Sequence, residues 1–229
     1  MIVDGSALDA IPRAARPGAQ VAASTAAGSA GAAASGARSN GRTADLAGDG
    51  SGRPWAVTFF GGVAIDDVAF SETVLQPWNG TWGSDTFLGL AGSYQLARFW
   101  RWFTVEPELG VGTRLGETDS VEAWGALYFR FDGFPWNRWL YTTVAASVGL
   151  NWISSLPVAE AGTPTAPEAN TSQVLHYFSP ELTFALPQHR QYEFVVRYHH
   201  RSGIFGAING VEDGSNVIAF GLRYRLPVR

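Results

Sequence analysis

The chain has 229 residues, no cysteine and a formal net charge of -4 at pH 7. The lack of cysteine excludes disulfides, thiolate metal sites and a cysteine nucleophile, and the mild negative charge argues against a nucleic acid partner. With 27 glycines, 9 tryptophans and 13% aromatic residues, the composition favours an all-β protein with many tight turns.

The N-terminal segment, residues 1–53, is dominated by Ala, Gly and Ser and shows no apolar periodicity. This composition is typical of a disordered extension. The segment also lacks the basic start, the continuous apolar stretch and the small-residue cleavage site of a secretory signal peptide. We therefore expect a disordered segment, followed by one folded domain over residues 54–229.

From Trp55 onward, eight segments alternate in side-chain polarity as strands do. No segment of similar length has helical periodicity, and no apolar run reaches the roughly 18 residues of a membrane-spanning helix. The segments are Trp55–Ile65, Asp85–Phe99, Arg101–Leu115, Val121–Phe131, Trp139–Trp152, Gln173–Leu186, Gln191–Ser202 and Ser215–Leu226. An even number of antiparallel strands can close without leaving an edge, which predicts an eight-stranded up-and-down β-barrel.

Each segment has an apolar face and a polar or small face, which leaves two orientations open. A soluble lipocalin-like barrel would turn the apolar faces inward, and Gly80-Thr81-Trp82 has the form of that family's short GxW motif. A transmembrane barrel would turn them outward into lipid. Long connections (66–84, 153–172 and 203–214) alternate with short ones, with 116–120 as an exception, and aromatic residues crowd the short-turn end. The aromatic residues are Phe99, Trp100, Trp102, Phe103, Phe131, Phe134, Trp136 and Trp139. We therefore predict a transmembrane barrel.

In the transmembrane orientation, the polar faces point into a narrow lumen. Because buried charges need partners, we expect the acidic and basic side chains on these faces to pair and fill the interior. They are Glu106, Glu108, Glu122, Glu181, Glu193, Arg130, Arg197, Arg201, Arg223 and Arg225.

The last two segments carry the candidate catalytic residues. His200 and Ser202 lie two residues apart on the apolar face, at the rim where the long loops emerge. Asn216 emerges on the same face of the next strand, and a hairpin centred near Asn209 would bring Ser202 opposite Asn216. A base, a hydroxyl and an orienting amide are the components of a nucleophilic hydrolase. The alternative interpretation is that these residues only form a polar rim at the membrane interface and have no catalytic activity. His199 faces the lumen with an expected structural role, and His176 receives no role.

The chain resembles the outer-membrane lipid A 3-O-deacylase (PagL) family and proteins grouped as acyloxyacyl hydrolases. The resemblance spans Trp55 to Leu226. It rests on the His-x-Ser of the seventh strand and on the motifs HHRSGIFG, NGVEDGSN, GLRYRL, PELGVG, GFPWN and HYFSPELTFALP. It implies a bacterial outer-membrane location and hydrolysis of the 3-O acyl ester of lipid A, without a metal or cofactor.

The resemblance also implies roles for individual residues. Ser202 would attack the ester carbonyl, and His200 would take its proton as general base. The backbone N–H of Gly203 and the side chain of Asn209 are the candidates for stabilising the oxyanion.

This chain departs from the family at the third catalytic position, where the deacylases have a glutamate. The hairpin register places Asn216 there, and an asparagine can orient a histidine but cannot stabilise an imidazolium by charge. Glu212 and Asp213, in the preceding loop, are the other candidates. The expected partners are lipid A or lipopolysaccharide as substrate and the lipids of the outer membrane, with the chain a monomer or homodimer. The alternative is a non-catalytic outer-membrane barrel with a structural or binding role.

Overall fold

The structure is a computed structural model that describes residues 53–66, 80–163, 166–167, 170–212 and 214–227. Of the expected disordered segment, all but Arg53 lies outside the described residues, as does the candidate Asp213. The elements are β1 (Trp55–Asp66), β2 (Thr81–Tyr94), β3 (Ala97–Phe99), β4 (Phe103–Leu115), β5 (Ser120–Phe131), β6 (Tyr141–Ile153), α2 (Val158–Ala161), β7 (Gly162–Thr163), β8 (Ala166–Pro167), β9 (Val174–Phe178), β10 (Glu181–Ala185), β11 (Tyr192–Ser202) and β12 (Gly214–Leu226). In this part of the chain, no helix is long and apolar enough to cross a membrane.

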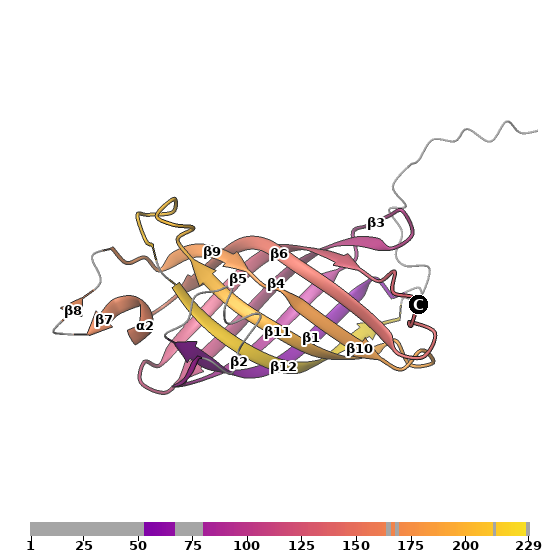
Figure 1. Ribbon diagram of the computed structural model, residues 1–229, viewed down its shortest axis with the longest axis horizontal. Helices are drawn as coiled ribbons and strands as arrows, with labels where there is room; N and C mark the ends of the chain where they lie inside the picture. Colours follow the sequence, from indigo (N-terminus) through magenta and orange to yellow (C-terminus); the bar gives the residue numbers. More distant parts are fainter. Residues whose placement is uncertain (1–52, 67–79, 164–165, 168–169, 213, 228–229) are drawn as a thin grey trace, which may run out of the picture. The chain divides into compact units, whose positions relative to one another are not determined.

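All the strands except β7 and β8 form one closed antiparallel sheet (Figure 1). Neighbouring strands follow the order β10, β11, β12, β1, β2, β4, β5, β6 and β9, and β6 and β11 each pair with both β9 and β10. β9 and β10 are therefore two halves of one barrel strand, interrupted at Pro180, which has no N–H to donate. β3 only extends the pairing of β4. The predicted eight-stranded antiparallel barrel is confirmed.

The structure differs from the predicted segments mainly where the chain bends. The second segment is split into β2 and β3 around Leu96, and β4 begins after a turn in which Trp100 and Arg101 have φ angles of 46° and 71°. The connection from Ile153 to Ser172, predicted as a plain loop, contains α2 and the small β7–β8 hairpin. These elements lie at the end of the barrel opposite to β3 (Figure 1).

The outward faces of the barrel strands are apolar. Leu109 is 75% exposed and Leu222 is 67% exposed. Other exposed large side chains of this surface are Phe59, Leu88, Leu90, Val111, Phe129, Val148, Leu150 and Phe220. A continuous apolar surface of this extent is the one that a lipid bilayer covers. The apolar-out orientation is therefore confirmed, and the lipocalin-like orientation is excluded.

Aromatic side chains ring the short-turn end of the barrel. Most of the predicted cluster is exposed there, with Trp100 at 71% and Trp139 at 65%. Phe131 and Phe134 differ, because their rings pack on each other at 5.1 Å and are only partly exposed. Amphipathic rings in this position are typical of the boundary between lipid and water.

The charged side chains predicted to face the lumen are all buried, as expected. Glu181 is the centre of their network, because it accepts hydrogen bonds from Arg130 (2.7 Å), Arg197 (2.6 Å) and Arg223 (2.8 Å). Arg197 also donates to Glu108 through two nitrogens, at 2.8 Å each. The pairing is therefore confirmed, and it fills the short-turn half of the barrel with a hydrogen-bonded polar core.

Aromatic rings fill the next layer of the lumen. Phe60, Phe87, Trp124 and Tyr177 form a buried cluster. The His199 ring packs against these aromatic rings. Its Nδ1 atom forms a 3.0 Å hydrogen bond with the Tyr177 hydroxyl, and its Nε2 atom lies 3.0 Å from a Glu122 oxygen. His199 thus faces the lumen, where the sequence places it.

Candidate active site

The candidate site lies where β11 ends and β12 begins. β11 and β12 pair along their whole length, with His200 opposite Asn216 and Ser202 opposite Gly214. The predicted register, with Ser202 opposite Asn216, is wrong by two residues. The conformation of the loop sets the register, and a shift of two residues keeps every side chain on its predicted face. His200, Ser202 and Asn216 therefore still share the outward face.

A short hydrogen bond joins His200 to Asn216. His200 Nδ1 lies 2.7 Å from Asn216 Oδ1. Because an amide oxygen only accepts hydrogen bonds, Nδ1 carries the proton and Nε2 carries the lone pair in the neutral ring. The ring of Tyr198 stacks along the same strand, with centroids 5.9 Å apart. The histidine is thus held in the tautomer that a general base requires.

Ser202 follows His200 on the same face, and both side chains are half-buried. Two residues along a strand span about 6.6 Å between Cα atoms, a gap that an imidazole ring pointing along the strand can bridge. The nitrogen able to accept the serine proton is Nε2, which the contact with Asn216 leaves unprotonated. The three residues have the functional groups that a nucleophile, a base and an orienting group would need.

The loop after Ser202 folds tightly. Ile204 and Phe205 adopt positive φ angles of 52° and 54°, a conformation that costs a β-branched residue about 1–3 kcal/mol. The N–H of Ile208 donates to the carbonyl of Gly203 at 2.8 Å. A Cβ atom at Gly203 would overlap the carbonyl oxygen of Val211, so only glycine fits there. The backbone that follows Ser202 is therefore held in one strained conformation.

The two proposed oxyanion donors are placed differently. Gly203 adjoins Ser202 in the chain, so its N–H lies beside that serine. The amide nitrogen of Asn209 instead donates to Ser172 Oγ (2.9 Å) and to the carbonyl of Val174 (3.2 Å). Both hydrogens of that amide are committed to the segment that enters β9, so Asn209 anchors the loop to the neighbouring strand.

The structure brings one of the proposed third members to His200. That residue is Asn216, which is 9% exposed. Glu212 is exposed at the end of the loop, and Asp213 lies outside the described residues. The orienting group at Nδ1 is thus an amide.

Near the site, α2 contacts β12 at the end of the barrel opposite to β3 (Figure 1). Arg201, between the two candidate residues in the chain, points inward and pairs with Glu160 of α2 at 2.9 Å. Burial raises the pKa of the Glu160 carboxyl, and the nearby Arg201 opposes that rise. The sequence alone could not reveal this contact, because α2 belongs to a connection without a polarity pattern.

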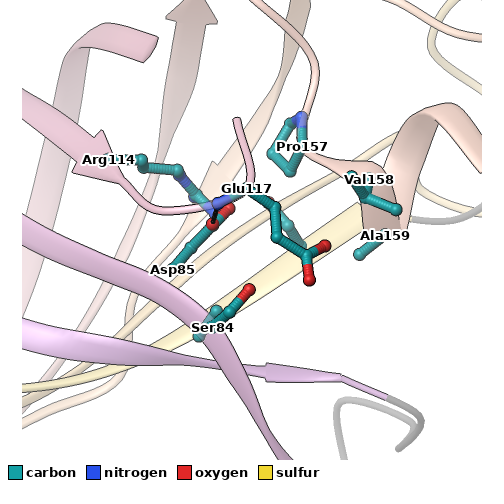
Figure 2. A pocket seen from close by; sticks show the side chains of 9 residues that line it. Ser84, Asp85, Arg114, Glu117, Pro157, Val158 and Ala159 are labelled. Carbon is teal, nitrogen blue, oxygen red and sulfur yellow. Dashed lines mark hydrogen bonds between the residues drawn. The ribbon is translucent and has the colours of Figure 1, made fainter. Parts of the chain in front are cut away.

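A small cavity lies beside α2 (Figure 2). It measures about 20 Å³, enough for a water molecule. Asp85 accepts a hydrogen bond from the backbone of Glu117 at its edge, at 2.7 Å. Arg114 is fully buried there, with Nε 3.6 Å from a Glu122 oxygen. Among the described residues, no group of three His, Cys, Asp or Glu side chains is arranged to hold a metal ion.

No protein-family model matches the sequence, and no curated protein matches it. Solved structures similar to the chain include Neisserial surface protein A, with 12% identity and a TM-score of 0.46 over 75% of this chain and 97% of that one. The outer membrane enzyme PagL has 12% identity and a TM-score of 0.49 over 75% and 99%. The N-terminal β-barrel domain of Pseudomonas aeruginosa OprF has 12% identity and a TM-score of 0.42 over 76% and 99%. At this level of similarity, the comparison describes the barrel fold alone.

Proposed function

We propose that the protein is an outer-membrane serine esterase that removes the 3-O-linked acyl chain of lipid A. The observation that carries this proposal is the 2.7 Å hydrogen bond between His200 and Asn216, with Ser202 next along the same outward face. A site on a lipid-facing surface suits a lipid ester, because the acyl chain stays in the bilayer while its ester reaches the serine. The resemblance of the His-x-Ser strand and its loop to the lipid A deacylases supports the choice of substrate.

The reaction would proceed in two steps. Ser202 Oγ attacks the ester carbonyl carbon while His200 Nε2 takes the hydroxyl proton, and the carbonyl oxygen becomes an oxyanion. Collapse of this intermediate expels the sugar oxygen, which takes the proton from His200, and leaves the acyl chain on Ser202. Water then attacks the acyl-serine while His200 takes one of its protons, and the fatty acid leaves as His200 gives that proton to Ser202 Oγ. The N–H of Gly203 would donate to the oxyanion.

Mass spectrometry of lipid A tests the proposal directly. Lipid A incubated with the folded barrel in mixed detergent micelles should lose the mass of one hydroxyacyl chain, and the fatty acid should appear in equal amount. Unchanged lipid A would contradict the esterase.

The amide at position 216 leads to a further prediction. Replacing Asn216 with aspartate keeps the shape of the side chain and places a carboxylate against Nδ1. Because the imidazolium formed during the reaction then gains a charged partner, we expect the rate of acyl release to rise by about tenfold. Initial rates measured by fatty acid release check this expectation.

The matched variant Asn216→Ala removes the orienting contact and should lower the same rate. Equal rates for the wild type and both variants would mean that His200 does not become charged during turnover.

The second candidate function is a non-catalytic outer-membrane barrel with a structural or binding role. Two observations favour it: the orienting group is uncharged, and the amide of Asn209 is committed to the entry into β9. It predicts that substitutions at the site leave lipid A unchanged in every case.

A further inference from the structure

A second histidine flanks Ser202 from the other side. β11 pairs with β9 as well as with β12, and in this register Ser202 lies directly opposite His176. Residues directly opposite each other on antiparallel strands have Cβ atoms about 4.5–5.5 Å apart, closer than the about 6.6 Å that separates alternate residues along one strand. By register, the Cβ atom of His176 is therefore expected to lie nearer to that of Ser202 than the Cβ atom of His200 does.

His176 shares the outward face with Ser202. Its chain neighbours Leu175 and Tyr177 are both fully buried and point inward, whereas His176 is half-buried. The His176 ring stacks on Phe178, with centroids 6.5 Å apart and planes 16° apart. Phe178 in turn lies opposite His200. Two histidine–aromatic stacks thus run side by side on β9 and β11, with Ser202 at the end of one and beside the histidine of the other.

The chemistry of the site leaves a role for this ring. His200 supplies the base, and the amide of Asn209 is bound to Ser172 and Val174. Asn209 was the only side chain that the sequence predicted as a hydrogen-bond donor to the oxyanion, and it donates elsewhere. A neutral imidazole carries one N–H, and a polar side chain on a lipid-facing surface is costly unless it meets a polar group.

We infer that His176 is a further catalytic residue, which donates a hydrogen bond to the oxyanion that forms when Ser202 attacks the ester. The inference rests on the proposed esterase function. It assigns the two histidines opposite tasks, with His200 accepting the serine proton and His176 stabilising the negative oxygen together with the N–H of Gly203.

The test replaces His176 with phenylalanine or glutamine. Phenylalanine keeps the ring stack and removes the N–H, and we expect kcat for acyl release from lipid A in mixed micelles to fall by about a hundredfold with KM within about twofold. Glutamine keeps a donor, so His176→Gln should retain a rate well above that of His176→Phe. His189 lies exposed in the turn at the opposite end of the barrel, so His189→Phe is the matched control and should leave kcat unchanged.

A fluorophosphonate probe gives a second reading, because it converts Ser202 into an adduct whose phosphoryl oxygen takes the place of the oxyanion. Its labelling rate should fall in His176→Phe in proportion to kcat. A kcat and labelling rate equal to the wild type, or a change in KM alone, would overturn the inference while leaving the esterase intact. A wild-type barrel that neither hydrolyses lipid A nor reacts with the probe would instead overturn the proposed function.

Discussion

On the proposed esterase mechanism, replacing Ser202 with alanine is expected to lower acyl release from lipid A by at least about a thousandfold, because only binding and oxyanion stabilisation would then assist attack by water. Ser202 lies on the outward rim, opposite His176 and Gly214, and the substitution removes a single half-buried hydroxyl. The fold should therefore be unaffected. Mass spectrometry of lipid A, with wild type and variant at equal concentration, measures the effect.

A matched serine is available on the opposite surface. Ser93 is buried in the lumen on β2, so Ser93→Ala makes the same chemical change on the lumen face. This control should hydrolyse lipid A at the wild-type rate. If lipid A loses its acyl chain equally with the wild type and with Ser202→Ala, another nucleophile acts. If neither protein releases the acyl chain, a non-catalytic barrel with a structural or binding role explains the site better.

The alternation of polarity along the strands predicts most of the barrel, because the period of a strand is two residues whatever the register. Arg201 and Ser202 show this clearly. Their opposite orientations follow from adjacent positions in one strand, and the structure places one in the lumen and the other on the outer face. The same reasoning places His200 and Asn216 on one face although their predicted cross-strand partners were wrong.

The register error has a local cause. Nothing in the side chains of Ile204 and Phe205 favours a positive φ, yet both adopt one and shorten the path from Ser202 to Gly214. Contacts between distant segments were equally hidden. The neighbour of Ser202 on β9 depends on how the barrel closes, so His176 had no visible role, and Glu160 meets Arg201 from a connection without a periodic pattern.

Replacing Glu181 with alanine should produce the largest loss of stability in the barrel. Four buried arginines (Arg130, Arg197, Arg223 and Arg225) face four buried glutamates (Glu106, Glu108, Glu181 and Glu193), so the network is neutral. Without Glu181 the count becomes four against three, and one positive charge stays uncompensated in the lumen. Breaking a buried ion pair in this way costs about 3–5 kcal/mol. Urea unfolding of the barrel in liposomes, followed by tryptophan fluorescence, measures this change.

The exposed Glu117 provides the control, because Glu117→Ala removes a carboxylate at the solvent-facing mouth and should change the unfolding free energy by less than about 0.5 kcal/mol. A double variant separates charge from packing. Glu181→Gln together with Arg223→Met restores neutrality, so it should be more stable than Glu181→Gln alone if the uncompensated charge is the cause. A double variant no more stable than that single variant would show that the hydrogen bonds from three arginines to Glu181, and not the balance of charge, hold this half of the barrel together.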